Sequence, residues 1–115
     1  MKVFISVPMR GRTDEEILDD IEDAKCKLAM ANSENDEPIY YVDNFVKTAF
    51  EAGIKNYSIW CLGRAIQKMS ECDAIYFCPG WKKARGCLIE RQVAIEYGLM
   101  CLYQDETGII FDVVL

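Results

Sequence analysis

The chain has 115 residues, of which 51% are hydrophobic and 28% charged, and its formal net charge is −6. This length supports one hydrophobic core, so we expect a single domain over residues 1–115. The acidic balance disfavours nucleic acid as a partner, because proteins that bind its backbone usually present a basic face. A small anionic ligand is still allowed, since a few arginines and backbone N–H groups can bind phosphate on an acidic protein.

Histidine is absent, which excludes Ser-His-Asp and Cys-His mechanisms and histidine-bound metals. The six cysteines include no pair at two-residue spacing, so buried free thiols are expected rather than a zinc site or disulfides. We therefore predict no cofactor and no metal. No apolar run approaches the roughly 18 residues of a membrane span, and no signal-peptide pattern is present. The prediction is a cytoplasmic protein with no membrane partner.

The first segment combines a strand and a helix. Residues 2–7 form an apolar, β-branched run that is typical of a central strand covered on both faces. Thr13 and Glu16 then have the Thr-x-x-Glu spacing of a capping box, which predicts a helix from near Asp14. Its apolar stripe follows three- and four-residue spacings. The stripe consists of Ile17, Ile21, Ala24, Leu28 and Ala31.

The loop between this strand and helix contains Arg10, Gly11 and Arg12. It should emerge at the carboxyl end of the strand. Two arginines around a glycine at a helix entrance can bind an anion. The alternative is that both arginines are solvated surface residues, as most exposed arginines are.

A second strand is predicted over residues 38–43, ending at Asp43. Residues 45–56 are ambiguous, because a possible helical turn is interrupted by Gly53. We interpret this segment as a mobile flap over the site. The alternative is an irregular connection that packs Phe45 and Phe50 into the core.

A second helix is predicted from Ser58, with its apolar face formed by Ile59, Leu62, Ile66 and Met69. It is followed by a buried strand over residues 74–78, which Pro79 and Gly80 end.

The next helix contains Glu90, which we expect in or near the first turn. Backbone N–H groups and the helix dipole there favour an ionised carboxylate, which makes Glu90 a candidate nucleophile or base. The alternative is an ordinary first-turn acid, because capping alone favours acidic residues at this position. The apolar stripe of this helix is predicted to be Ile89, Val93, Ala94 and Tyr97, with Gly98 as its C-terminal cap.

Two further strands are expected over residues 99–103 and 109–115. The five residues that join them are too few for a parallel crossover, so the last strand should pair antiparallel at an edge or reach another subunit. The alternation of strands and helices predicts a flavodoxin- or Rossmann-like three-layer α/β sandwich, mostly parallel, with strand order 2-1-3-4 and a C-terminal edge strand. That order brings the Arg10 loop beside the Glu90 loop at the switch point.

Three motifs resemble the small nucleoside 2-deoxyribosyltransferase-like proteins of bacteria and phages, many of which are known only as domains of unknown function. They are FISVPMRG at residues 4–11, CDAI at residues 72–75 and GWKKARGCLIE at residues 80–90. The likeness extends from Lys2 to about Tyr103.

The resemblance implies retaining cleavage or transfer at an N-glycosidic bond. In that family a glutamate at Gly-x-x-x-Glu spacing, matched here by Gly86 and Glu90, attacks the anomeric carbon of a 2-deoxynucleoside or its 5′-monophosphate. The covalent sugar intermediate then passes to another base or to water. The resemblance also implies a homodimer or larger homo-oligomer.

The resemblance assigns further residues to substrate binding, and the 5′-phosphate falls to the two loops. The substrate-binding set is Ser6, Met9, Arg10, Gly11, Arg12, Trp81 and Gly86. Trp81 is the candidate for stacking on the base, ahead of Tyr40 and Tyr57, although simple core packing is an equal alternative.

Two positions depart from the enzymes: Ala84 replaces a polar residue six positions before the glutamate, and Ala65 replaces an acidic one. The leaving base therefore lacks an obvious proton donor, and Asp43 is the carboxylate that we nominate. The departures leave two other readings open. One is a non-catalytic nucleotide-binding module, in which Glu90 accepts a hydrogen bond from a ribose hydroxyl. The other is an oligomerising structural protein.

Overall fold

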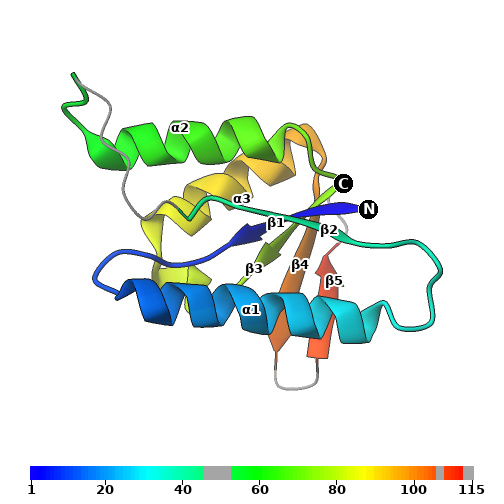
Figure 1. Ribbon diagram of the computed structural model, residues 1–115. Coiled ribbons are helices and arrows are strands. Elements are labelled where there is room, and N and C mark those ends of the chain that lie inside the picture. The colour runs from blue at the N-terminus through cyan, green and yellow to red at the C-terminus, as the bar shows by residue number, and fades with distance from the viewer. Residues whose placement is uncertain (46–52, 106–107, 113–115) are drawn as a thin grey trace.

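The structure is a computed structural model that describes residues 1–45, 53–105 and 108–112, the last stretch and residue 105 by backbone only. Figure 1 shows three layers, with α1 on one side of a sheet and α2 and α3 on the other. In chain order the elements are β1 (Lys2–Ser6), α1 (Asp14–Ala31), β2 (Tyr40–Asp43), α2 (Tyr57–Met69), β3 (Ala74–Phe77), the 3₁₀ turn η1 (Trp81–Lys83), α3 (Arg85–Tyr97), β4 (Met100–Asp105) and β5 (Gly108–Asp112).

The sheet has the order β2-β1-β3-β4-β5, in which the first four strands are parallel and β5 runs antiparallel to β4. This confirms the predicted flavodoxin- or Rossmann-like α/β fold and its antiparallel last strand. In register, Ser6 pairs with Phe77 of β3, and Phe77 pairs with Tyr103 of β4. These residues mark the carboxyl edge of the sheet. The predicted turn near Val46 lies outside the described residues, as does most of the segment interpreted as a flap.

Each face of the sheet has its own core because side chains alternate along a strand. On the α1 face, Val3, Ile5 and Val7 pack against Ile17 and the rest of the helix stripe. On the other face, Phe4, Ile75 and Phe77 pack against α2 and α3. Ser6 follows the parity of Phe4, so it lies on the α2 and α3 face.

The first helix matches its prediction closely. The capping box is present, with the Thr13 hydroxyl accepting from the Glu16 N–H and Glu16 accepting from the Thr13 N–H. Four of the five stripe residues are buried, and only Ala31, the last residue of the helix, is exposed.

The other two helices are rotated from their predicted orientation. On α2 the buried residues are Ala65 and Met69, whereas Ile59 is 65% exposed. On α3 the buried face is Cys87, Glu90 and Ala94, while Tyr97 is 80% exposed. Met69 and Ala94 are buried as predicted, but the predicted stripes were wrong at Ile59 and Tyr97. The smaller side chains of Ala65 and Cys87 face the sheet instead and let the helices approach it closely.

The burial predicted for the thiols is confirmed in part: Cys78, Cys87 and Cys101 are buried, and Cys26 is exposed on α1. Among the helices that the structure describes, none is both long and apolar enough to cross a bilayer.

Candidate functional site

The centre of the site is a hydrogen bond between the last residue of β1 and a side chain of α3. The Ser6 hydroxyl donates to Glu90 Oε1 over 2.6 Å. Both residues are almost fully buried, with exposed fractions of 1% for Ser6 and 8% for Glu90. The switch point of this strand order lies between β1 and β3, so the pair stands where an open α/β sheet binds its ligand.

Glu90 does not lie in the first helical turn. It stands five residues after Arg85, the first residue of α3, and the first turn holds no acidic residue. Its carboxyl therefore gains little from the terminal N–H groups, and the predicted preference for the ionised form is wrong. Burial raises the pKa of Glu90 to about 7, and the hydrogen bond from Ser6 partly opposes this rise. Near neutral pH both protonation states are populated.

The second carboxyl oxygen of Glu90, Oε2, accepts no hydrogen bond from any residue that the structure describes. It is the oxygen available to a ligand. The described part of the chain also contains no group of three or more cysteines, aspartates and glutamates placed to hold a metal ion.

An aromatic cluster lies beside this pair on the same face of the sheet. The Trp81 ring is 5.4 Å from that of Phe77 and 5.1 Å from that of Tyr103. Arg91, next to Glu90, contacts the Trp81 ring and donates from Nε to the Tyr103 hydroxyl over 2.8 Å. Gly80 enables the turn into η1 with a φ of 90°, a conformation that other residues rarely adopt. Trp81 thus packs on the core while staying half-buried at the sheet's edge.

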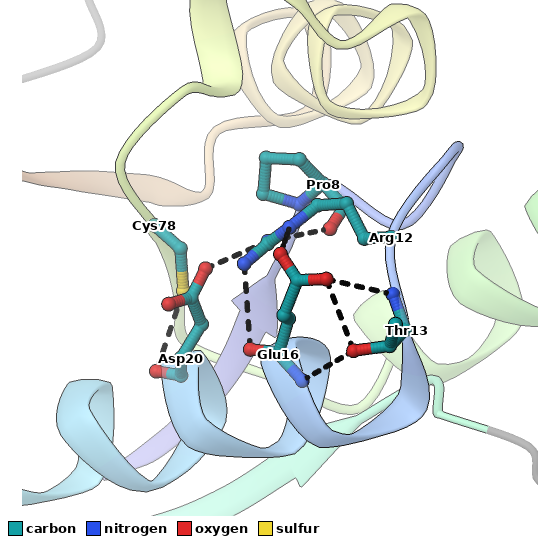
Figure 2. A network of polar contacts seen from close by, with 6 residues as sticks. All are labelled: Pro8, Arg12, Thr13, Glu16, Asp20 and Cys78. Carbon is teal, nitrogen blue, oxygen red and sulfur yellow. Dashed lines mark hydrogen bonds and ion pairs between the residues drawn. The ribbon is translucent and has the colours of Figure 1, made fainter.

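The two arginines of the β1–α1 loop have different surroundings, and Figure 2 shows those of Arg12. Arg12 donates to Asp20 over 2.7 Å and to the Pro8 carbonyl over 2.9 Å, and its pKa is raised chiefly by the Asp20 hydrogen bond. Arg12 therefore has a structural role, because it connects the loop to α1. Arg10 is exposed, and no described residue forms an ion pair or hydrogen bond with it. Gly11 has a φ of 75° in the turn between them.

The remaining predicted residues lie in several places. Met9 packs against the core on the α1 side of the sheet. Asp43 pairs with Ile5, so its side chain position belongs to the face of the sheet that α1 covers. Neither is therefore on the face that carries Glu90. Gly86 is exposed near the start of α3, with open space around its Cα. The structure thus brings Ser6 and Glu90 into direct contact.

The two poorer stacking candidates also lie apart from that contact. Tyr40 pairs with Lys2, at the end of the sheet opposite to the one where Ser6 lies. Tyr57 stacks on Trp60 within α2.

Sequence reasoning missed Asn44, the residue after β2. Asn44 is 8% exposed, and its Nδ2 donates to the Cys61 carbonyl of α2 over 2.8 Å. Continuing the β1–β2 register by one residue places Asn44 opposite Ser6. Strand parity was the available signal: Asn44 and Ser6 each stand two positions after an inward-facing apolar residue, Val42 and Phe4.

A mostly parallel sheet in the order β2-β1-β3-β4-β5, with helices on both faces, defines an α/β domain of the flavodoxin-like class. Within that class, the chain belongs to the family described as domain of unknown function DUF4406, whose model matches residues 1–103. No curated protein and no solved structure was found to match the chain.

Proposed function

We propose that the protein cleaves or transfers the N-glycosidic bond of 2′-deoxynucleosides or their 5′-monophosphates, in the cytoplasm, with Glu90 as nucleophile. One observation carries the proposal: a carboxyl buried at the switch point, held through one oxygen by Ser6, with its other oxygen accepting no hydrogen bond from the described residues. The resemblance to nucleoside 2-deoxyribosyltransferase-like proteins supports the same reaction.

The chemistry requires the ionised form of Glu90. Oε2 would attack C1′ of the sugar, the C1′–N bond would break, and its electron pair would leave with the base. Water or a second base would then attack C1′ and release the carboxylate, and the proton that this nucleophile loses to solvent balances the one that the departing base anion takes from it. The ionised carboxylate stabilises the positive charge that develops on the sugar, and burial strengthens that interaction. Ser6 holds the carboxylate in one orientation and favours its ionised form.

A 5′-phosphate would be bound by Arg10 and by the N–H groups of the Gly11 turn. Arg12 contributes to this binding by fixing the loop, since its guanidinium is already bonded to Asp20. Trp81, which is half-buried, would cover the base.

A second candidate function is a nucleotide-binding module without turnover. The position of Asp43 favours it, because a carboxyl on the α1 parity of β2 cannot protonate a base held beside Glu90. In that case Glu90, with a pKa of about 7, exchanges hydrogen bonds with a sugar hydroxyl instead of attacking C1′.

The test is overnight incubation of the protein with 2′-deoxynucleosides and their 5′-monophosphates, followed by chromatography of the free base. Glu90→Gln is the test variant. Glu96→Gln is the matched control, since Glu96 is an exposed glutamate on the same helix. We expect base release by the wild type and Glu96→Gln, and none by Glu90→Gln. Absence of release with a ligand-dependent rise in melting temperature would favour the binding module.

A further inference from the structure

Asn44 carries the one buried side-chain oxygen or nitrogen of the described residues that has no hydrogen-bond partner. Its Oδ1 is completely enclosed, whereas its Nδ2 is bonded to the Cys61 carbonyl. An unpaired buried acceptor destabilises the folded state, so native proteins seldom retain one without a reason. A site where a ligand supplies the missing donor is such a reason.

The location of Asn44 points to the same site. Its side chain reaches α2, so it lies on the face of the sheet that carries Ser6 and Glu90. Because the β1–β2 register, continued by one residue beyond Asp43, sets Asn44 beside Ser6, we expect a separation near the ordinary strand spacing of about 5 Å. On the face of the sheet that carries Ser6, Asn44 Oδ1 and Glu90 Oε2 are thus two acceptors that no described residue supplies with a donor.

The chemistry of these two oxygens selects the ligand group. Two acceptors repel a phosphate and attract O–H or N–H donors. If C1′ of a nucleoside meets Glu90, the donors about one strand spacing away are the ring hydroxyls of the sugar. The amino group of a base lies farther from C1′, beyond the base ring.

We propose that Asn44 Oδ1 accepts a hydrogen bond from a ring hydroxyl of the substrate's sugar, which makes Asn44 a specificity-determining residue. This inference rests on the proposed function for its choice of ligand. It adds a residue on β2 that recognises the sugar, separate from the Arg10 loop that would bind the phosphate.

The test measures binding, so that it does not depend on turnover. In a Glu90→Gln background, affinities are compared for three 5′-monophosphates of one base, adenine unless the release assay identifies another. These ligands are the 2′-deoxy, the 3′-deoxy and the 2′,3′-dideoxy nucleotide, which differ only in their ring hydroxyls. We expect one hydroxyl-bearing ligand to bind about tenfold tighter than the dideoxy ligand, as one hydrogen bond in a buried site allows.

Asn44→Ala and Asn44→Leu should both reduce this ratio to about one. Leucine keeps the side-chain volume, so it separates loss of the acceptor from loss of packing. Asn56→Ala is the matched control because Asn56 Oδ1 caps the same helix, α2, through the Ile59 N–H. It should lower the melting temperature and leave the ratio unchanged.

The two proposals fail in different ways. Three outcomes would overturn the role of Asn44. The affinity ratio could persist in folded Asn44→Leu, it could equal one when Asn44 is present, or none of the three ligands could bind. A ratio abolished in the Asn44 variants, without base release by the wild type, would support this role and reject the glycosidic reaction alone.

Discussion

The pKa of the Glu90 carboxyl lies near neutral pH, so small changes of pH around 7 change its charge. Burial against the sheet raises its pKa to about 7, and Ser6 is the named group that opposes this rise. A nucleophile must be ionised, so base release should decline as pH falls through 7. The rate of base release as a function of pH should therefore follow the protonation of Glu90.

Replacing Ser6 with alanine should shift that profile upward. A hydrogen bond to a charged group is worth roughly 1.5–3 kcal/mol, which corresponds to about one to two pKa units. We expect the acid limb of base release in Ser6→Ala to move to higher pH by that amount, with the rate partly recovered at alkaline pH. An unshifted midpoint would show that Ser6 has no influence on the carboxyl.

Substitution of the two loop arginines should have different effects, because Arg10 is proposed to contact the ligand and Arg12 connects the loop to α1. Arg10→Ala should weaken binding of a 5′-monophosphate by about tenfold and leave the parent nucleoside unaffected, since one charge-assisted contact is lost. Arg12→Ala should also weaken binding of the monophosphate, because it releases the phosphate-binding loop from Asp20, and of the two variants only this one should lower the melting temperature. Titration of each variant with both ligands makes the comparison, and equal effects of Arg10→Ala on both ligands would contradict it.

At the scale of the elements, the start of α1 organises the loop that faces the site. Thr13 and Glu16 close the capping box, and Arg12 bonds to the next turn through Asp20 (Figure 2). The helix therefore fixes the turn that contains Arg10 from both sides, through Pro8 before it and Thr13 after it.

Thr13→Ala should cost about 1 kcal/mol of unfolding free energy, the usual value of an N-cap. For a domain of this size that corresponds to a melting temperature lower by about 4 °C. Thr13→Ser should restore it, because serine offers the same acceptor to the Glu16 N–H. A Thr13→Ser variant as unstable as the alanine would show that the methyl group, not the cap, stabilises the helix start.

Element by element, the sequence predicted the sheet better than the site. Alternating apolar runs and helix signals were enough for the order β2-β1-β3-β4, because right-handed connections leave few alternatives. On the buried face of α3 only Ala94 was predicted, since Cys87 is a weaker apolar signal than Ile89 or Tyr97 and Glu90 is polar. Asp43 was nominated because it is a carboxylate at the end of the predicted second strand. The next residue, Asn44, lies on the opposite face, and the register with β1 that decides the face follows from tertiary packing.

For the whole molecule, Glu90 lowers stability at neutral and alkaline pH. The pKa is about 7 in the folded state against an ordinary 4.5, so the folded state binds the proton more tightly. The unfolding free energy therefore falls as pH rises from about 4.5 to 7 and is constant above it, for this group. The total is about 3 kcal/mol at 1.36 kcal/mol per pKa unit.

Glu90→Gln should remove this penalty, because a neutral amide still accepts from Ser6. We expect the variant to melt about 10 °C above the wild type at pH 8 and close to it at pH 4.5. Glu96→Gln should follow the wild type at both values. A Glu90→Gln variant without a gain at pH 8 would show that the buried carboxyl is not strained in the folded protein.

The contacts around the site also form at different stages of folding. Arg12 and Asp20 are eight residues apart, so their bond closes within a short stretch of chain. Ser6 and Glu90 are 84 residues apart, and their bond requires β1, β3 and α3 to be docked together. Since closing a long loop costs more entropy, the short-range bond should form early and the long-range bond late. A folding intermediate that lacks the docked α3 therefore carries an ordinary, solvated glutamate, and the raised pKa of Glu90 marks completion of the native state.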